Sequence, residues 1–364
     1  MSKKTTITLA STFVATSVFL SGCGLFGGEK VSEEIDPPKD VTYVEDEQAL
    51  ENDPGLSDGK GNEKEEGDQK EEATQTIKRD IYLIDKNGYV VPQSFELPKQ
   101  EGVAKQVLEH LVQGGPVTNM LPDGFSAPLP ADTEVGVNME KDGTIVADFS
   151  KEFKNYKAED ELKILQAITW TLTQFDGVEK VKIRINGHDQ KVMPVNNTPI
   201  GDGVSRANGI NFDSSGVIDI TQTKAATLYY VAQNGDDTYY VPVTKRIEAK
   251  GQNAYVTIIN ELIKGPSATS GLVSDFNSDV ALLDEPKYED GNVTLNFNEN
   301  ILGNLEGNKV SQHVVNSLVL SLTEQAGVES VAITVDGKAK LTDHNGKELS
   351  APVTRPKNVN TGSF

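Results

Sequence analysis

The sequence contains very little cysteine, tryptophan and positive charge. One cysteine and one tryptophan occur in 364 residues, and 34 Lys and Arg stand against 55 Asp and Glu, for a net charge of −21. A single cysteine cannot form an internal disulfide framework. Contacts to nucleic-acid phosphates or to anionic lipid headgroups need clustered Lys and Arg. We therefore expect no nucleic-acid partner and no polybasic membrane patch.

Residue patterns typical of catalytic and metal sites are also missing. The four histidines do not stand at metal-ligand spacing with one another or with Cys; they are His110, His188, His313 and His344. We expect His110 and His313 on the polar faces of helices. Gly201-Asp202-Gly203 is not followed by the Lys-Ser/Thr of a phosphate-binding loop. We expect no catalytic residue, metal, cofactor or small-molecule substrate, and hence no enzyme.

Three features admit both a functional and a structural interpretation. Glu159-Asp160-Glu161 could pair as acid and base, although acids at a helix start more commonly favour the helix dipole. Asp85-Lys86-Asn87-Gly88 resembles the start of a calcium loop but lacks the acidic ligand at the twelfth position, so a hairpin turn is favoured. Five aromatic residues could stack on sugars, but core packing or an edge interface is favoured: Trp170, Tyr229, Tyr230, Tyr239 and Tyr240.

The N-terminus has the pattern of a secretory signal. Lys3 and Lys4 precede an uncharged, largely apolar stretch over 7–20 that is too short to span a membrane permanently. Leu20-Ser21-Gly22-Cys23 then resembles the lipobox of bacterial lipoproteins. That resemblance implies cleavage before Cys23, a diacylglycerol on its thiol and an acyl chain such as palmitate on the new amine. Two acyl chains, at about 0.8 kcal/mol per buried CH2, anchor stably; the alternative is an ordinary signal with an incidental cysteine.

The segment after Cys23 is poor in apolar residues and rich in Glu, Asp, Lys, Gly and Asn. Such a segment buries too little surface to offset the entropy of ordering. We expect 23–78 to be an acidic, disordered tether, with Val41-Thr42-Tyr43-Val44 as a short β-prone exception. A binding tail is the alternative interpretation of its charge.

The rest of the chain contains an internal repeat. The stretch over 171–181 returns roughly 150 residues later as 321–331, and further pairs recur in the same order. These pairs include Gly115-Pro116 with Gly265-Pro266, Asn186-Gly187 with Asp336-Gly337, and Ser205-Arg206 with Thr354-Arg355. Their common order indicates a duplicated domain. We expect a first domain over 79–206, a linker over 207–226, a second domain over 227–355 and an irregular tail over 356–364.

Periodicity predicts the same elements in each repeat. The first should have strands over 80–84, 89–97, 135–139, 144–149 and 181–185, a helix from Val103 to Val112 capped by Gly114, and a helix striped by Ile164, Ile168, Leu172 and Phe175. The second should have strands over 228–232, 239–246, 280–288, 292–297 and 331–335, and helices containing 255–263 and Val310 to Leu322. The fold class is α+β, with two tandem homologous α/β sandwich domains. The 37% hydrophobic content suggests two modest cores rather than one large core.

Several segments, within the repeats and beyond them, carry a resemblance that covers nearly the whole chain. They include Leu111-Val112-Gln113-Gly114-Gly115-Pro116, Tyr240-Val241-Pro242-Val243-Thr244-Lys245-Arg246 and Asn360-Thr361-Gly362-Ser363-Phe364. With the lipobox and the two repeats, the chain resembles the bacterial sporulation and germination lipoproteins that carry tandem GerMN domains. This resemblance implies domains similar to ring-building motifs, whose usual order begins with a helix. The leading hairpins would then be an added or rearranged element.

The resemblance also implies a location and a role. The protein is expected on the extracytoplasmic face of a membrane, between mother cell and forespore. There it would act as an assembly factor for the protein components of the transenvelope channel complex. Cys23 is the only functional position that carries over. The alternative function is that of an extracytoplasmic lipoprotein that binds peptidoglycan or another glycan.

Overall fold

The computed structural model describes residues 75–215, 221–248, 253–302, 309–338, 341–342, 346 and 348–361. The predicted signal peptide, Cys23 and the tether up to residue 74 lie outside the described residues. Within the described ranges, no helix has both the length and the apolar content required to cross a membrane.

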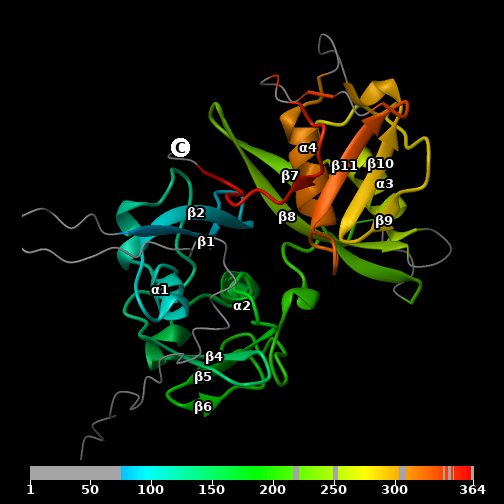
Figure 1. Ribbon diagram of the computed structural model, residues 1–364. Coiled ribbons are helices and arrows are strands. Elements are labelled where there is room, and N and C mark those ends of the chain that lie inside the picture. The colour runs from blue at the N-terminus through cyan, green and yellow to red at the C-terminus, as the bar shows by residue number, and fades with distance from the viewer. Residues whose placement is uncertain are drawn as a thin grey trace, which may run out of the picture. The chain divides into compact units, whose positions relative to one another are not determined.

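The first repeat begins with a hairpin and continues with helix, hairpin, helix and strand pair (Figure 1). Its elements are β1 (Thr76–Ile84), β2 (Val90–Pro98), α1 (Val103–Glu109), β3 (Val135–Met139), β4 (Thr144–Phe149), α2 (Glu161–Leu172), β5 (Lys180–Ile185) and β6 (His188–Asp189). The prediction that a hairpin leads the repeat is confirmed.

The second repeat has the same order of elements. They are β7 (Thr223–Asn234), β8 (Asp237–Glu248), α3 (Ala254–Lys264), β9 (Lys287–Glu289), β10 (Asn292–Phe297), α4 (Gln312–Leu322), β11 (Ser330–Val335) and β12 (Val353–Thr354). Two tandem mixed α/β domains are therefore confirmed.

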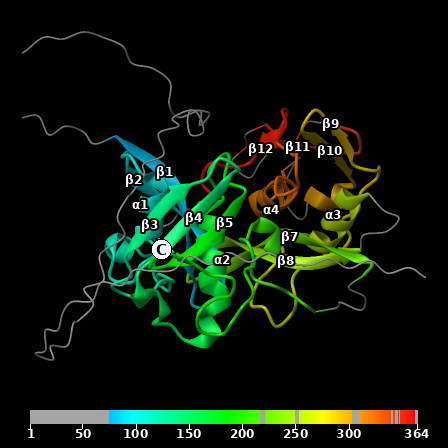
Figure 2. The ribbon, with the colours of Figure 1, turned by 90° about the horizontal axis from the view of Figure 1, so that it is seen from below.

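Each repeat contains a four-stranded sheet, in the order β3-β4-β5-β6 or β12-β11-β10-β9. The two central strands of each sheet are parallel, as β4 with β5 and β10 with β11, because a helix crosses over between them. Figure 2 shows β3, β4 and β5 side by side. The hairpins β1–β2 and β7–β8 form separate two-stranded sheets.

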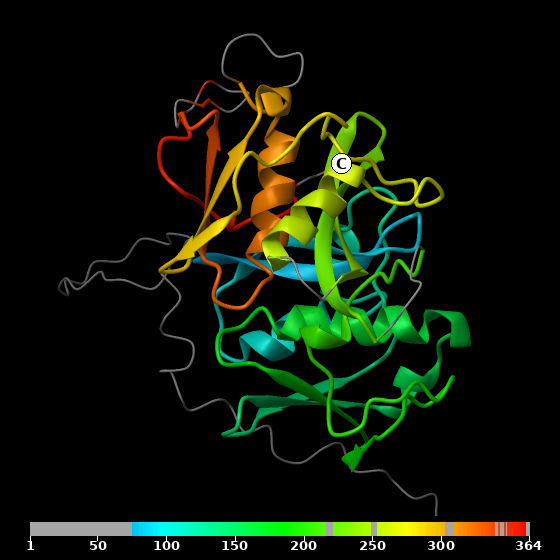
Figure 3. The same ribbon diagram turned by 90° about the vertical axis from the view of Figure 1, so that its right-hand side faces the viewer.

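Helix α2 lies between its hairpin and its four-stranded sheet (Figure 3). Ten of its twelve residues are buried, including Gln166 and Thr169 on the side away from Ile164. A helix covered on two sides must be apolar nearly all round. Helix α4 packs in the same way between β7 and β11. Each repeat is thus three layers deep: hairpin, helices and sheet.

Four predicted elements are shorter in the structure. Helix α2 ends at Leu172 and does not reach Phe175, and helix α4 begins at Gln312 and does not include Val310. Helix α1 ends at Glu109, not Val112, because the chain tightens there: the Leu111 and Val112 N–H groups donate to Leu108 and Glu109, three residues back. Gly114 is therefore not its cap; His110 is. The strand predicted over 280–288 is ordered as β9 only over Lys287–Glu289. Pro286, which has no N–H to donate, lies directly before it.

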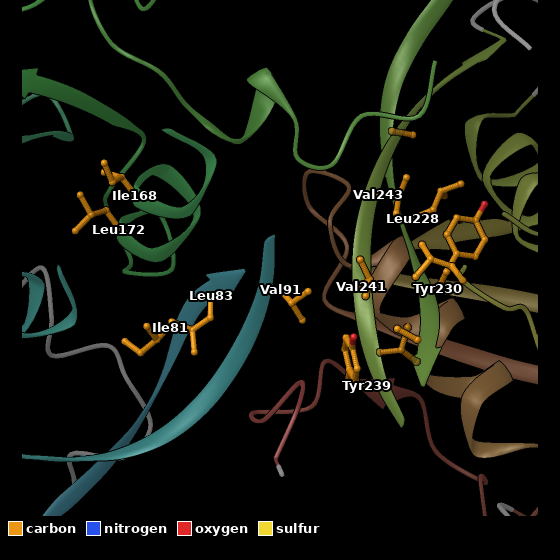
Figure 4. Packing of buried hydrophobic residues seen from close by; sticks show 14 of the residues in the cluster. Ile81, Leu83, Val91, Ile168, Leu172, Leu228, Tyr230, Tyr239, Val241 and Val243 are labelled. Carbon is orange, nitrogen blue, oxygen red and sulfur yellow. The ribbon is translucent and has the colours of Figure 1, made fainter. Parts of the chain in front are cut away.

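The main cluster of buried apolar side chains extends through both repeats, so the prediction of two separate cores is wrong. It includes Ile81, Ile168 and Leu172 of the first repeat and Leu228, Tyr230 and Val241 of the second (Figure 4). Two smaller clusters occupy equivalent places in the repeats. One is Tyr82, Val90, Ala167, Trp170 and Ile210, and the other is Tyr229, Val231, Tyr240, Leu320 and Val359.

The segments predicted as tether end, linker and tail contribute to the folded body. β1 starts at Thr76 and β7 at Thr223, each inside a predicted connecting segment. Ile210 in the linker is 0% exposed, and Asn360 in the tail is 4% exposed. The linker and the tail are therefore packed over part of their length, and the tether end continues into β1.

Candidate functional site: the junction between the repeats

A network of buried polar groups lies where the two leading hairpins meet. β2 of the first repeat contacts β8 of the second. Two segments take part and are named here: the first strap is residues 206–213 and the second strap is residues 355–360. The first strap follows the first repeat, and the second strap follows the second.

Asn211 of the first strap joins the two hairpins. Its Oδ1 accepts a hydrogen bond from the Val90 N–H at 2.8 Å. Its Nδ2 donates to the carbonyls of Val90 at 2.7 Å and Pro242 at 2.8 Å. The residue has φ 47°, in the left-handed region that Asn tolerates better than most residues. One side chain thus connects β2 to β8.

Asn360 of the second strap makes the same three contacts with the repeats exchanged. Its Oδ1 accepts from the Tyr240 N–H at 2.7 Å, and its Nδ2 donates to the carbonyls of Tyr240 at 3.0 Å and Pro92 at 2.7 Å. Val90 and Pro92 stand in β2 where Tyr240 and Pro242 stand in β8. The junction therefore has local twofold pseudo-symmetry.

The prolines explain why side chains are needed here. Pro92 and Pro242 have no N–H, so β2 and β8 cannot pair through a complete backbone ladder. An asparagine side chain offers one carbonyl and one NH2 group, the same groups as a peptide unit. Asn211 and Asn360 therefore supply the hydrogen bonds that the backbone cannot make.

The straps also exchange backbone hydrogen bonds between repeats. In the first strap, the carbonyl of Ile210 accepts from the Thr244 N–H at 2.8 Å, and the Asp213 N–H donates to the Thr244 carbonyl at 3.0 Å. In the second strap, the carbonyl of Asn360 accepts from the Ser94 N–H at 2.9 Å. Each strap leaves its own repeat and lines a strand of the other.

A buried carboxylate holds both straps at their first residues. Glu324, whose side chain is 9% exposed, accepts hydrogen bonds from Arg206 at 3.1 Å and from Arg355 at 2.7 Å. The Tyr229 hydroxyl donates to it at 2.8 Å. Burial alone would raise the pKa of Glu324, but Arg355 and Arg206 outweigh burial and lower it. Glu324 thus stays ionised and links the two strap arginines.

The two arginines have matching surroundings. Arg206 lies over the Trp170 ring at 4.5 Å, and Arg355 lies over the Tyr229 ring at 5.2 Å. Each arginine also donates to a threonine at the end of its own repeat's second helix. Arg206 donates to Thr173 at 3.1 Å, and Arg355 donates to Thr323 at 2.9 Å. Both arginines are therefore fixed by packing as well as by charge.

The hairpin turns add a further pair of contacts across the junction. The Tyr239 hydroxyl donates to the Asp85 carboxylate at 2.7 Å, and the Tyr89 hydroxyl donates to the Ser270 carbonyl at 2.9 Å. Phe125 packs edge-on against Tyr239 with ring centroids 5.2 Å apart. Asp85 also accepts from the N–H groups of its own turn, so the hairpin-turn interpretation of 85–88 is confirmed.

Comparison with known proteins identifies the family. The family described as "Germane: Sporulation and spore germination" matches residues 80–191 and 227–341, one stretch in each repeat. The chain is 52% identical over 366 aligned residues to the spore germination protein GerM of Bacillus subtilis (strain 168), covering 100% of both chains. The chain belongs to the Germane family. This confirms the family expected from the sequence motifs.

A solved structure extends the similarity to the arrangement of the repeats. The Germane chain matches "Tandem GerMN domains of the sporulation protein GerM from Bacillus subtilis" at 56% identity and a TM-score of 0.75. The match covers 79% of this chain and 100% of that chain, so it spans both repeats at once. The tandem α/β fold is thereby confirmed.

The acidic triplet of this Germane protein is not an acid–base pair. Glu159 is exposed and Asp160 pairs with Lys163 at 3.1 Å, whereas Glu161 is fully buried. The Glu161 carboxylate accepts from the N–H groups of Val195, Asn196 and Thr198 at 2.9, 2.6 and 2.9 Å. It therefore organises the loop over 195–198. Burial alone would raise the pKa of Glu161, but these bonds and the Tyr156 hydroxyl lower it to about 2.

The aromatic residues considered for sugar stacking are core residues. All five are at most 8% exposed: Trp170, Tyr229, Tyr230, Tyr239 and Tyr240. The core interpretation is therefore confirmed, and the glycan-binding alternative loses the residues on which it rested.

The prediction of a polar-face position is wrong for His110, the C-terminal cap of α1, because the residue is buried. His110 is 6% exposed and its Nδ1 lies 2.7 Å from the Gln106 carbonyl. His313 is half-buried and hydrogen-bonded to the Tyr240 hydroxyl at 2.9 Å. Among the described residues, no group of three or more His, Cys, Asp and Glu side chains is placed to hold a metal ion.

The sequence interpretation missed Asn211, Asn360 and Glu324. A signal was present for the two asparagines: each follows its repeat's arginine at the same spacing, Arg206 to Asn211 and Arg355 to Asn360. No repeated pattern pointed to Glu324, because the equivalent residue of the first repeat is Gln174. Gln174 instead bonds the backbone of Asp80, accepting at 3.0 Å and donating at 2.7 Å.

Proposed function

We propose that this chain is a lipoprotein anchored through Cys23 to the extracytoplasmic face of a membrane, where it serves as an assembly factor for the transenvelope complex between mother cell and forespore. Membership of a sporulation and germination family supports the process. The signal-like start followed by Leu20-Ser21-Gly22-Cys23 supports the anchor.

The junction is the observation on which the scaffold role rests. Glu324, Asn211 and Asn360 hold two folded repeats in one body with a shared core. A protein that brings other proteins together acts through binding surfaces held at compatible distances. Two repeats at a fixed spacing can provide such surfaces. The acidic segment between Cys23 and β1 would act as a spacer between the membrane and the folded repeats.

The anchor is tested with Cys23→Ala in sporulating cells. We expect the protein to leave the membrane fraction, and the assembled complex and the sporulation frequency to fall together. Ser21→Ala is the matched control, since it keeps a small residue before Cys23 and should behave as wild type. Normal assembly and sporulation with Cys23→Ala would contradict the proposal.

The scaffold role is tested separately by deleting one repeat while keeping the anchor. We expect the truncated protein to reach the membrane without supporting assembly of the complex. Normal complex in cells that contain only one repeat would show that the fixed pair is not needed.

A further inference from the structure

Strand β3 is the outermost strand of the first repeat's sheet and pairs only with β4 (Figure 2). The Ser150 N–H donates to the Glu134 carbonyl, and the Glu140 N–H donates to the Thr144 carbonyl. In an antiparallel ladder, residues whose backbone groups bond to the partner strand alternate with residues whose backbone groups point away from it. The even-numbered residues of β3 thus face β4, and the backbone groups of Val135, Val137 and Met139 point away from it.

These outward groups form an open edge. Throughout the described ranges, no hydrogen bond satisfies the N–H or C=O groups of Val135, Val137 or Met139 on that side. Their side chains pack on the core, Val135 buried and the other two half-buried. A strand added beside β3 would therefore gain backbone hydrogen bonds and would continue an apolar face.

The equivalent edge of the second repeat is protected. β9 has only three residues, with Lys287 and Glu289 among them and Pro286 just before. Short length, charge and proline are common means of preventing strand addition. β3 has five residues and contains neither charge nor proline. The two repeats have thus diverged at this position, and the first alone keeps an edge suited to pairing.

The charge around β3 determines which kind of strand fits. Glu134 is exposed at one end of the strand. Gly136 has no side chain, and a Cβ there would lie 3.8 Å from the Cβ of Asp148 on β4. No side chain at position 136 separates the edge from Asp148, whose carboxylate also accepts a hydrogen bond from the Gly187 N–H at 3.1 Å. A partner strand with Lys or Arg on this face would meet two carboxylates.

A second copy of this chain fits poorly. Antiparallel self-pairing centred on Val137 would set Glu134 of one chain opposite Glu140 of the other, and like charges directly opposite destabilise a sheet. The net charge of −21 adds to the repulsion.

We propose that β3 is the docking edge for an extended segment of a partner protein, which adds to the sheet as a strand with apolar residues toward the core and Lys or Arg toward Glu134 and Asp148. The proposal rests on the scaffold function above and specifies which surface of the first repeat meets a partner. Such β-strand addition combines backbone hydrogen bonds for affinity with alternate side chains for specificity.

The test uses the full chain and a short synthetic peptide that alternates lysine and valine. With this peptide, amide hydrogen exchange at Val135, Val137 and Met139 should slow about tenfold or more. A peptide with glutamate in place of lysine should give no such slowing. Amides that are already protected in the free chain, or equal protection by both peptides, would overturn the proposal.

A matched pair of variants tests the edge itself. Val137→Ala and Val137→Pro both remove the valine side chain, but only proline removes the outward N–H and blocks the edge. Because that N–H makes no bond to β4, we expect similar urea midpoints for the two variants. Peptide affinity should fall about tenfold or more for Val137→Pro and stay near wild type for Val137→Ala. Equal affinity for the two would refute strand addition.

A second pair of variants tests whether the partner strand must carry positive charge. This pair also tests the proposal if Val137→Pro does not fold. Gly136→Arg places a positive charge beside Asp148, whereas Gly136→Ala adds only a methyl group. Peptide binding should be lost for Gly136→Arg and kept for Gly136→Ala. In cells, sporulation with Val137→Pro or Gly136→Arg at normal frequency would refute the edge while leaving the anchored scaffold intact, because that scaffold is tested by Cys23→Ala and repeat deletion.

Discussion

A few buried side chains stabilise this protein by making hydrogen bonds that backbone groups normally make with one another. Asn211 and Asn360 replace peptide groups where Pro92 and Pro242 interrupt the contact between hairpins. Glu161 collects three backbone N–H groups of a distant loop. Because each group is buried and hydrogen-bonded, removing one partner leaves others unsatisfied, which costs more than the bond itself contributes.

Asn360→Ala should therefore be strongly destabilising, although only four residues follow it in the sequence. It leaves two carbonyls and one N–H unpaired, and we expect a loss of about 2–3 kcal/mol in the free energy of unfolding. Urea denaturation measures this change in the free energy of unfolding. Lys357→Ala, at an exposed position of the same strap, is the control and should change stability by less than about 0.5 kcal/mol. Equal effects would show that the tail does not fasten the junction.

Glu161 predicts an acid-sensitive stability. Its pKa is lowered from an ordinary value of 4.5 to about 2 in the folded protein. Its stabilisation is thus fully present above pH 4.5 and is lost as the pH falls from 4.5 toward 2. Glu161→Gln should lower stability at pH 7 by about 2 kcal/mol, and the difference from wild type should shrink toward pH 2.

Urea midpoints at several pH values measure this effect. Glu159→Gln, at an exposed neighbouring carboxylate, should show no such trend. A constant difference between Glu161→Gln and wild type across the pH range would contradict the assignment.

Among the elements, the leading hairpins and the straps create the junction, while the four-stranded sheets lie on the other side of the helices. The helices α2 and α4 are apolar on two sides because a hairpin covers one side and a sheet covers the other. The added hairpin thus both completes its own repeat and supplies the surface through which the repeats join.

The first strap packs closely at Gly209, against the side chains of Phe212 and Thr244. Gly209 has φ 77° and ψ 178°, and an added Cβ would lie 2.6 Å from the Phe212 ring and 3.0 Å from Thr244. Gly265, at φ 83° and ψ 179°, has the same strained backbone, but its Cβ would meet only Ser274 at 3.4 Å. Gly265→Ala therefore measures backbone strain alone, about 1–3 kcal/mol.

Gly209→Ala should cost about 1 kcal/mol more than Gly265→Ala, because its Cβ would also crowd the buried Thr244 side chain. Thermal unfolding of the two variants gives the comparison. Equal costs would mean that the strap can shift away from β8 without penalty.

At the level of the whole molecule, the shared core predicts that the two repeats unfold together. Calorimetry of residues 75–364 should show one transition, with equal calorimetric and van't Hoff enthalpies. The double variant Asn211→Ala/Asn360→Ala should separate it into two transitions, since both asparagine bridges between β2 and β8 are then lost. Two transitions in the wild type would show that the repeats are independent.

Local patterns in the sequence account for most elements of this chain. The strands over 135–139, 144–149 and 292–297 agree with the structure residue for residue. Apolar residues alternate with polar residues or glycine in the first and the third, and an Asp-Gly turn directly precedes the second and the third. Where local hydrogen bonding overrides periodicity, as at the end of α1 and before β9, the prediction is too long.

By itself, the amino-acid sequence determined the duplication, because short motifs recur in the same order. It also determined the order of elements in each repeat and the family, since these depend on motifs of residues close together in the chain. Only the tertiary structure decided how the repeats join. Asn360 lies 268 residues from Pro92, and Glu324 lies 118 residues from Arg206. No local pattern encodes such pairs: their energy appears only when folding brings the hairpins together and excludes water from the groups between them.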